Sequence, residues 1–338
     1  MNLPQQMTAM TISAPGGPEV LRARMVPVPE CGAGEILIRV AAAGVNGPDL
    51  AQRRGVYDPP AGHSPIPGLE VAGVVARVGA DVSGWAPGQG AAALTNGGGY
   101  AEFVAVPAGQ ALPIPDGMAM ATMAGLPETY FTVMQTLVMR AGLEAGMSVL
   151  VHGAAGGIGG AAVVIARLLG ARPIAVVSAD DKADYAMALG AEAAIVHARE
   201  DFVARALELT GGRGADRIVD VAGGETTARN IEAAARGGHI VLVATQGGGS
   251  AKLPLNKVLH KQLILSGSTL RPQSVATKAA IAAQLRRLVW PHLQAPDYPK
   301  PAVTTYPLAD AAEAHRRLEE RGFFGKAVLV TPFGQRFV

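Results

Sequence analysis

The sequence predicts a two-domain α/β protein in which a six-stranded parallel sheet is inserted into a strand-rich domain. Residues 7–128 contain short apolar runs separated by glycine, proline and aspartate turns. From about residue 147 the pattern changes to an apolar strand, a turn and a helix, repeated along the chain. The length of 338 residues, 49% of them hydrophobic, is sufficient for two cores.

The strand-rich part predicts a partly open β-barrel. Its apolar runs MTAMTI, EILIRVAAAGV, VAGVVARV and YAEFVAV are short and bounded by turn residues. This spacing is typical of antiparallel strands and not of a helical layout. We therefore assign residues 1–128 to the first part of the barrel domain.

The middle of the chain predicts a doubly wound sheet. Six apolar segments, from SVLVHG to QLILSGST, alternate with segments that have helical character. Strands connected by helices run parallel, so residues 129–270 are predicted to form a Rossmann fold. Residues 271–338 contain a long amphipathic helix, a last helix and the strand KAVLVTP, which we expect to return to the barrel domain.

The first strand-to-helix turn, HGAAGGIGGAA at 152–162, predicts a dinucleotide site. Gly156, Gly157 and Gly159 would permit a tight turn, let a pyrophosphate approach the backbone and let the helix pack on the sheet. The helix N-terminus would supply N–H donors to the phosphates. The alternative is a glycine-rich packing turn without a ligand.

The second strand favours NADPH over NADH. NAD-binding proteins usually place an acid about 20 residues after the glycine turn, but Ser178 stands there in this chain. Lys182 follows one helical turn later, where its ammonium could meet a 2′-phosphate; the alternative is an ordinary exposed lysine. We interpret Asp180 and Asp181 as first-turn acids, with Ser178 as the N-cap.

Composition excludes several classes of protein. The net charge of +2 does not suggest nucleic-acid binding. The single cysteine, Cys31, excludes an internal disulfide and a multi-cysteine zinc site. We find neither a membrane-spanning apolar run nor a secretion signal, so we expect a cytoplasmic enzyme.

The stretch IPGLEVAGVV places one carboxylate, Glu70, among glycines and β-branched residues. Such a run is typical of a buried strand, where a carboxylate is costly without a partner. Glu70 could therefore be a metal ligand, an acid or a structural anchor.

Several ordered motifs resemble the medium-chain dehydrogenase/reductase superfamily. These are GLEVAGVV, the turn AAGGIG and the closing GKAVL at 325–329. The chain is most similar to zinc-free quinone oxidoreductases of the zeta-crystallin type, and GGPEVL, RRGVYDPP and GLPET bring it near the p53-inducible NADPH:quinone oxidoreductase subgroup. The resemblance implies a GroES-like catalytic domain, NADPH as cofactor and a homodimer.

The resemblance also addresses zinc. Zinc alcohol dehydrogenases carry histidine before the glutamate and cysteine at the position of Asn46, whereas this chain has Leu69 and Asn46. Leucine and asparagine cannot supply an imidazole and a thiolate, so we expect no metal. Glu70 is then expected to be a buried carboxylate held by hydrogen bonds or a basic partner; a catalytic acid or a ligand contact are the alternatives.

The resemblance implies a set of site residues. Asn46 and Tyr57 are the candidate catalytic residues, with a turn-stabilising role and loop packing as their alternatives. Arg321 is a further candidate, with an exposed helix-end residue as its alternative. The candidate cofactor-binding residues are Asn46, Thr132, Gly156, Gly157, Ile158, Ser178, Lys182, His197, Ala222, Ala244, Gly247, Ser268, Thr269 and Leu270.

The predicted function is zinc-independent transfer of hydride from NADPH to a quinone. A quinone is already electrophilic, so the protein needs only to bind, orient and exclude water. One alternative is an NADPH-dependent enone reductase, which needs a proton donor. Others are a non-catalytic NADPH-binding protein of the crystallin or RNA-binding type and a zinc alcohol dehydrogenase.

Overall fold

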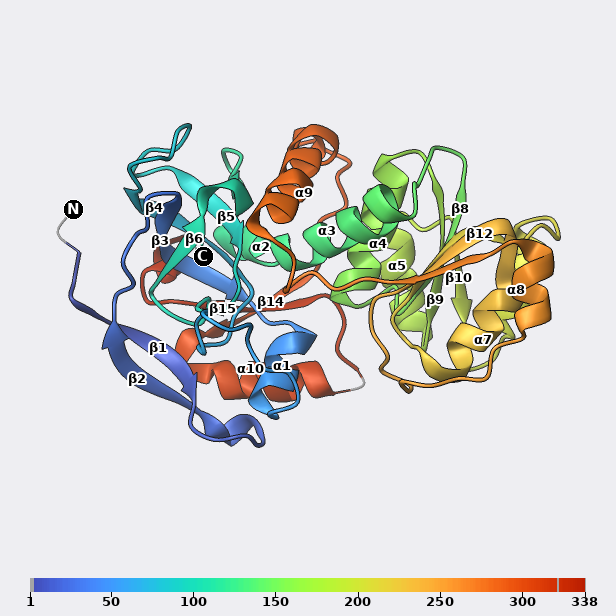
Figure 1. The fold of residues 1–338 in the computed structure, drawn as a ribbon, viewed down its shortest axis with the longest axis horizontal. Coiled ribbons are helices and arrows are strands. Elements are labelled where there is room, and N and C mark those ends of the chain that lie inside the picture. Colours follow the sequence, from blue (N-terminus) through green and yellow to red (C-terminus); the bar gives the residue numbers. More distant parts are fainter. Residues whose placement is uncertain (1–2, 321, 338) are drawn as a thin grey trace. The chain divides into compact units, whose positions relative to one another are not determined.

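The computed structural model describes residues 3–320 and 322–337 (Figure 1). The chain divides into two compact units. The first unit ends its opening segment at Phe131 and adds Arg271–Arg286 and the segment that begins at Ala302. The second unit comprises Thr132–Leu270 and Arg287–Pro301. The candidate Arg321 lies outside the described residues.

The first unit is built on a seven-stranded, mostly antiparallel sheet. Its order is β14-β15-β3-β4-β5-β7, and β6 pairs with the other part of β3. A separate antiparallel hairpin joins β1 to β2. The strands are β1 (Gln6–Ile12), β2 (Leu21–Pro27), β3 (Glu35–Gly44), β4 (Glu70–Val78), β5 (Gly90–Leu94), β6 (Phe103–Pro107), β7 (Ala111–Pro113), β14 (Val303–Pro307) and β15 (Lys326–Val330).

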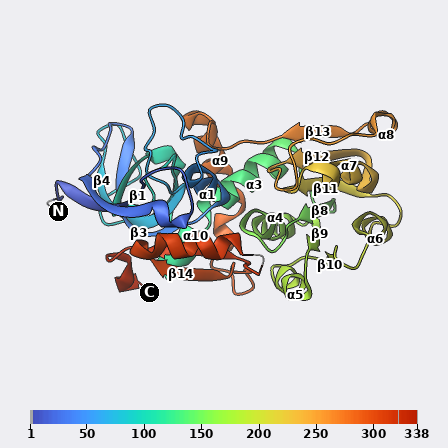
Figure 2. The ribbon, with the colours of Figure 1, turned by 90° about the horizontal axis from the view of Figure 1, so that it is seen from below.

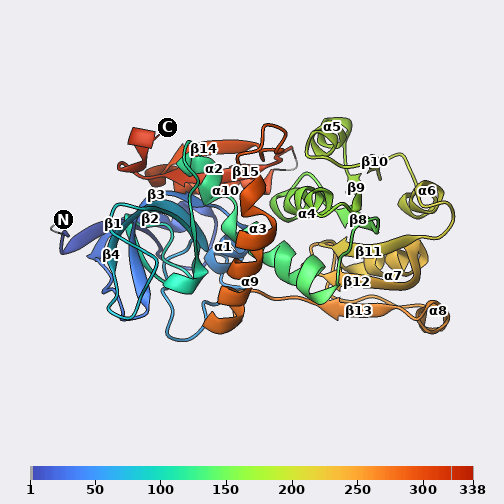
Figure 3. The same ribbon diagram turned by 90° about the horizontal axis from the view of Figure 1, so that it is seen from above.

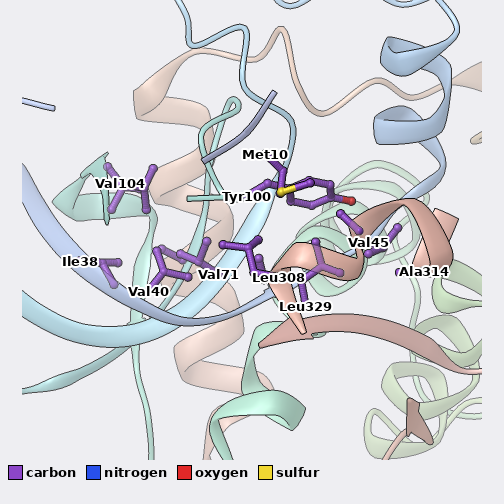
Figure 4. Packing of buried hydrophobic residues seen from close by; sticks show 14 of the residues in the cluster. Met10, Ile38, Val40, Val45, Val71, Tyr100, Val104, Leu308, Ala314 and Leu329 are labelled. Atoms are coloured by element: carbon purple, nitrogen blue, oxygen red, sulfur yellow. The ribbon is translucent and has the colours of Figure 1, made fainter. Parts of the chain in front are cut away.

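The core of the first unit joins segments from both ends of the chain. Met10, Val71, Tyr100, Leu308 and Leu329 pack in one buried cluster, as Figure 4 shows. The C-terminal strands join the sheet through the pairing of β15 with β3. The helices are α1 (Gly47–Arg53), α2 (Met120–Ala124), α3 (Pro127–Val133), α9 (Val275–Leu288) and α10 (Ala311–Glu319), with 3₁₀ turns at Pro18–Val20, Ala108–Gln110, Leu308–Asp310 and Gly334–Phe337.

The second unit contains the six-stranded parallel sheet that the sequence predicts. Its strand order is β10-β9-β8-β11-β12-β13, the order of a doubly wound dinucleotide-binding fold (Figure 3). The strands are β8 (Ser148–His152), β9 (Arg172–Val177), β10 (Ala193–Val196), β11 (Ala215–Asp220), β12 (Ala234–Leu242) and β13 (Ile264–Gly267). The predicted fold class, a barrel-type domain plus a Rossmann domain, is confirmed.

Helices cover both faces of this sheet. Figure 2 shows α4 and α5 on one face and α6 and α7 on the other. The helices are α4 (Gly157–Leu168), α5 (Asp180–Ala188), α6 (Phe202–Leu209), α7 (Gly224–Ala233) and α8 (Leu255–Lys261); α3 continues into a π-helix at Met134–Arg140, and Trp290–His292 forms a 3₁₀ turn. No helix in the described part of the chain is long and apolar enough to cross a bilayer.

One helix boundary differs from the predicted one. The sequence predicts a helix over 226–238, but α7 ends at Ala233 and β12 begins at Ala234. Gly237 has a φ of 73°, which a helix does not accommodate, and it is followed by Gly238. Ala234 pairs instead with Ala215, so backbone hydrogen bonding to β11 takes over from the helix.

Candidate functional site

The glycine turn between β8 and α4 depends on two glycines for different reasons. Gly153 has a φ of 62°, in the left-handed region that favours glycine. A Cβ at Gly159 would lie 2.2 Å from the Gly153 oxygen and 2.6 Å from the Ala154 Cα. The tight turn is therefore made by Gly153, which the sequence analysis did not single out, and Gly159 allows α4 to pack against it.

The N-terminus of α4 supplies the candidate phosphate site. Gly156 is the N-cap, so the amides of Gly157 and Ile158 belong to the first helical turn, whose N–H groups lack intrahelical acceptors. Ile158 also lines a small pocket together with Thr132 and Val219. The structure thus brings together two of the predicted cofactor-binding residues, Ile158 and Thr132.

The remaining predicted cofactor residues follow the carboxyl ends of parallel strands, at the edge where ligands of this fold bind. The Gly247 N–H donates to the Ala222 oxygen at 2.6 Å, which joins the loops after β11 and β12. The Thr136 hydroxyl donates to Ser268 Oγ at 3.1 Å. The predicted residues placed along this edge are Ser178, His197, Ala222, Ala244, Gly247, Ser268, Thr269 and Leu270.

The predicted N-cap of α5 is wrong. Ala179, not Ser178, occupies the N-cap, and no side chain caps this helix end. The Asp181 carboxylate instead accepts the Lys182 N–H at 2.9 Å. Ser178 therefore stands outside the helix, one residue before the cap. Asp180 and Asp181 do lie in the first turn, and Asp180 pairs with Arg199 at 2.5 Å, which offsets its negative charge near Lys182.

Asp220 holds the loop after β11, and the sequence analysis did not identify it. Its Oδ1 accepts the N–H groups of Ala222 and Gly223, both at 2.9 Å. Its Oδ2 accepts the Thr227 hydroxyl at 2.6 Å and the Asn230 amide at 3.1 Å. With four donors this buried carboxylate fixes a loop at the ligand-binding edge. An acid that directly follows the apolar pair Ile218–Val219 at the end of a strand is the signal that could have found it.

In the first unit, Glu70 lies at the centre of a buried hydrogen-bond network. Lys326 Nζ donates to Glu70 Oε1 at 2.5 Å and to Asn46 Oδ1 at 2.7 Å. Asn46 Nδ2 also donates to Glu70 Oε1, at 2.9 Å. The Glu70 side chain is fully buried, and its second oxygen accepts the Glu128 N–H at 2.8 Å. The expectation of a buried carboxylate held by hydrogen bonds and a basic partner is confirmed.

Backbone geometry makes room for this network. A Cβ at Gly44 would lie 2.0 Å from Glu70 Oε1, so β3 carries glycine where the carboxylate enters. Asp49 accepts the Asn46 N–H at 2.9 Å and the Gly68 N–H at 2.8 Å. Asn46, Asp49 and Glu70 are thereby locked together at the start of α1.

The crowding of carboxylates changes their protonation. Burial raises the pKa of Glu128 to about 8, and the charges of Glu70 and Asp49 add to the rise. Burial also raises the pKa of Asp49 to about 6, against its backbone hydrogen bonds. At neutral pH Glu128 is therefore mostly a neutral carboxylic acid, which can donate a proton.

Tyr57 lies beside a second group of buried polar side chains. The guanidinium carbon of Arg271 lies 5.4 Å from the centre of the Tyr57 ring. Arg271 Nη2 donates to Gln52 Oε1 at 2.9 Å and to the Asn96 oxygen at 3.1 Å. Lys278 Nζ donates to Asn96 Oδ1 at 2.5 Å. Of the two candidate catalytic residues, Asn46 thus belongs to the Glu70 hydrogen-bond network, whereas Tyr57 lies beside the Arg271 guanidinium in the same unit.

The side chains around Glu70 do not fit zinc. Asn46 and Leu69 supply neither thiolate nor imidazole, and the Lys326 ammonium already occupies the cation position between Asn46 and Glu70. Among the residues that the structure describes, no group of three or more His, Cys, Asp and Glu side chains could hold a metal.

Comparison with known proteins agrees with this architecture. The family model for the alcohol dehydrogenase GroES-like domain matches residues 32–116, and that for zinc-binding dehydrogenases matches residues 157–284. The quinone oxidoreductase of Mus musculus is 30% identical over 332 residues, which is 96% of this chain and 98% of that protein. This chain belongs to the quinone oxidoreductase family of the medium-chain dehydrogenases/reductases.

Solved structures support the same placement. The Escherichia coli quinone oxidoreductase complexed with NADPH superimposes with a TM-score of 0.80 at 28% identity, covering 96% of this chain and 99% of that one. A solved NAD-dependent alcohol dehydrogenase has a TM-score of 0.82 at 34% identity, covering 96% and 99%. The chain is thus an NAD(P)-dependent oxidoreductase of this family.

The sequence analysis assigned no role to three charged residues of the first unit. They are Glu128 in GLPET, Lys326 in GKAVL and Arg271, which directly follows Leu270. All three side chains are buried. The sequence signal available for such residues is a charged residue beside an apolar strand or a proline-containing turn. This signal indicates that the side chain is buried, but it does not identify the residue that pairs with it.

Proposed function

We propose that this protein is a zinc-independent, NADPH-dependent quinone reductase. The observation that supports zinc independence is the position of the Lys326 ammonium. It binds the Asn46 and Glu70 oxygens that a metal ion would need as ligands. The family membership supports the quinone, and the Escherichia coli relative solved with NADPH supports the cofactor.

When bound, NADPH supplies the hydride, and the protein positions the cofactor and the substrate. We assign Gly156, Gly157 and Ile158 to the pyrophosphate, since they form the start of α4. Ser178 and Lys182 are assigned to the 2′-phosphate.

The other cofactor residues proposed are Thr132, His197, Ala222, Ala244, Gly247, Ser268, Thr269 and Leu270. Asn46 and Tyr57 are proposed to orient the nicotinamide ribose and the substrate ring. The hydroquinone anion is then protonated from solvent or from a neighbouring acid.

The finer assignments rest on resemblance. RRGVYDPP, GLPET and GGPEVL support membership of the p53-inducible NADPH:quinone oxidoreductase subgroup. The same resemblance supports a homodimer and a cytoplasmic location. We propose domain limits at 1–128, 129–270 and 271–338, with the middle segment as the NADP-binding domain and the flanking segments as the GroES-like one.

Enone reduction is a second candidate, and Glu128 is the observation that favours it. Hydride addition to the β-carbon of an enone leaves an enolate that requires a proton. Glu128 is buried and its pKa is raised to about 8, so it holds a proton at neutral pH. It would give that proton to the enolate and recover one from solvent.

The test is NADPH oxidation with 1,2-naphthoquinone and with a panel of enones, repeated with NADH and with EDTA. Quinone turnover that is selective for NADPH and insensitive to EDTA is the expected result. Turnover of enones alone would replace the quinone by the second candidate. NADPH binding without turnover would favour the crystallin-type alternative, and loss of activity in EDTA would contradict the zinc-independent mechanism.

A further inference from the structure

Two cations of the first unit are buried without a carboxylate in direct contact. Arg271 is 4% exposed and Lys278 is fully buried. In the described part of the chain neither side chain forms an ion pair with a carboxylate. Buried charges are normally paired, because an isolated ion loses its hydration without compensation.

The guanidinium of Arg271 is only partly satisfied. Its Nη2 donates to Gln52 and to the Asn96 backbone, but its Nε and Nη1 are buried and have no hydrogen-bond partner. The Tyr57 ring lies near the guanidinium and does not use those N–H groups. An arginine has no acceptor and does not lose its proton, so only an incoming acceptor can satisfy them.

Lys278 adds a second positive charge at the same place. Its Nζ donates to the Asn96 side chain at 2.5 Å and to the Arg271 backbone oxygen at 2.8 Å. Both acceptors are neutral, so neither hydrogen bond brings a counter-charge. Burial lowers the pKa of Lys278 to about 8; the Glu128 charge opposes the drop and the Arg271 charge adds to it. At pH 7 the lysine is therefore still mostly charged.

The nearby carboxylates are engaged elsewhere. Glu70 is paired with Lys326, and both oxygens of Asp49 accept backbone N–H groups. Glu128 has a raised pKa and is mostly neutral at pH 7. The charges of Asp49 and Glu128 still act on Arg271 and Lys278, but neither carboxylate bonds to the Arg271 Nε and Nη1 groups. An acceptor for those two N–H groups must therefore come from outside this set of side chains.

We propose that Arg271 and Lys278, beside Tyr57, form a subsite for a carboxylate or sulfonate carried by the substrate. This rests on the proposed function, which it narrows to quinones or enones that bear an anionic group. The aromatic face of Tyr57 next to the guanidinium suits a planar substrate with its charged group at one end. A phosphate of the dinucleotide has the same oxyanion chemistry and is separated from this proposal by the experiment.

The first arm compares 1,2-naphthoquinone-4-sulfonate with 1,2-naphthoquinone, which differ in one anionic group. In the unaltered protein the sulfonate is expected to have the higher kcat/KM. Arg271→Gln should lower that preference 10- to 100-fold, the range of a charged hydrogen bond. Arg24→Gln, at an exposed arginine of β2, should leave it unchanged. An equal loss for both quinones would reduce Arg271 to a structural role and overturn the proposal.

The second arm measures binding without turnover, so it stands even if no quinone is reduced. Calorimetry of the cofactor-free protein with 4-oxopentanoate should show binding that Arg271→Gln abolishes and Arg24→Gln retains. No binding to the unaltered protein would overturn the subsite. A rise in the KM for NADPH in Arg271→Gln, with no change in the sulfonate preference, would assign the cations to the cofactor and overturn it as well. Thermal unfolding of each variant checks that it is folded.

Discussion

The two units build their candidate sites from different material. In the second unit the site is mostly backbone: Gly153, Gly159 and the first amides of α4 form a turn whose shape depends on missing side chains. In the first unit the site consists of buried charged side chains around Glu70 and Arg271. Backbone geometry is a local property of the sequence, whereas a charge network depends on partners brought together by the fold.

The separation along the chain makes this contrast concrete. Gly153 and Gly159 stand within one turn and helix. The side chains of Asn46, Glu70 and Lys326 come from the N-cap of α1, from β4 and from β15, and Lys326 is 256 positions from Glu70. Substitutions should therefore act locally in the second unit and cooperatively in the first.

The largest effect is expected for Lys326→Met. The substitution leaves the Glu70 carboxylate buried with no counter-charge, which costs about 3–5 kcal/mol of unfolding free energy. Denaturation by urea measures the loss. Lys252→Met, at an exposed lysine, is the matched control and should change the stability by less than about 0.5 kcal/mol. Adding Glu70→Gln to Lys326→Met should restore part of the loss; full additivity of the two changes would show that they do not interact.

The next effect tests the backbone site. In Gly159→Ala the new Cβ meets the Gly153 oxygen at 2.2 Å, so the turn must move, at about 1–3 kcal/mol. NADPH affinity, measured by the quenching of protein fluorescence, should fall at least about tenfold. In Gly156→Ala the nearest atom is the Gly153 oxygen at 3.4 Å, an ordinary contact, and the turn should keep its shape. Equal losses of stability in the two variants would contradict the packing argument.

The same contrast decides what the sequence could predict. The six strands and the glycine turn of the second unit follow from local pattern, and the predicted sheet is confirmed. The limit of α7 was missed because Ala234 pairs with Ala215, a contact that the local pattern does not contain. The N-cap of α5 was misplaced by one residue, since Ser and Ala are adjacent at 178–179 and only the backbone angles choose between them.

The first unit was predictable in outline only. The position of Glu70 among apolar residues predicted that its carboxylate has a partner. Because zinc-type ligands are absent from the motif, the predicted partner was a hydrogen-bond donor or a basic side chain. Lys326 could not be identified as that partner. Nothing in the spacing of the sequence tells that β15 pairs with β3 and so brings this lysine, rather than another basic residue, to Glu70. Arg271 and Glu128 acquire their properties from the neighbours that the fold supplies.

Glu128→Gln sharpens the comparison through pH. The pKa of Glu128 is raised to about 8, above the ordinary 4.5, so the folded protein holds a proton that the unfolded chain releases. The contribution of this proton to the free energy of unfolding is fully present below pH 4.5 and is lost as the pH rises toward 8. The variant should therefore be more stable than the unaltered protein at pH 8, by roughly 1–3 kcal/mol, and similar to it at pH 5. The difference is measured by thermal unfolding of both proteins between pH 5 and pH 8. If the stabilities of the two proteins changed in parallel with pH, Glu128 would be ionised in the folded protein.

The smallest effect is expected for Lys182, a side chain of the second unit that is proposed to contact the cofactor. If Lys182 meets the 2′-phosphate, Lys182→Ala should raise the KM for NADPH about tenfold, the value of one screened charge contact, and leave that for NADH unchanged. Lys257→Ala, at a lysine that pairs with Glu232 on the surface, is the control. A rise for both cofactors would indicate a structural role for Lys182. The 2′-phosphate would then be recognised by Ser178 and the backbone amides beside it, without a charged side chain.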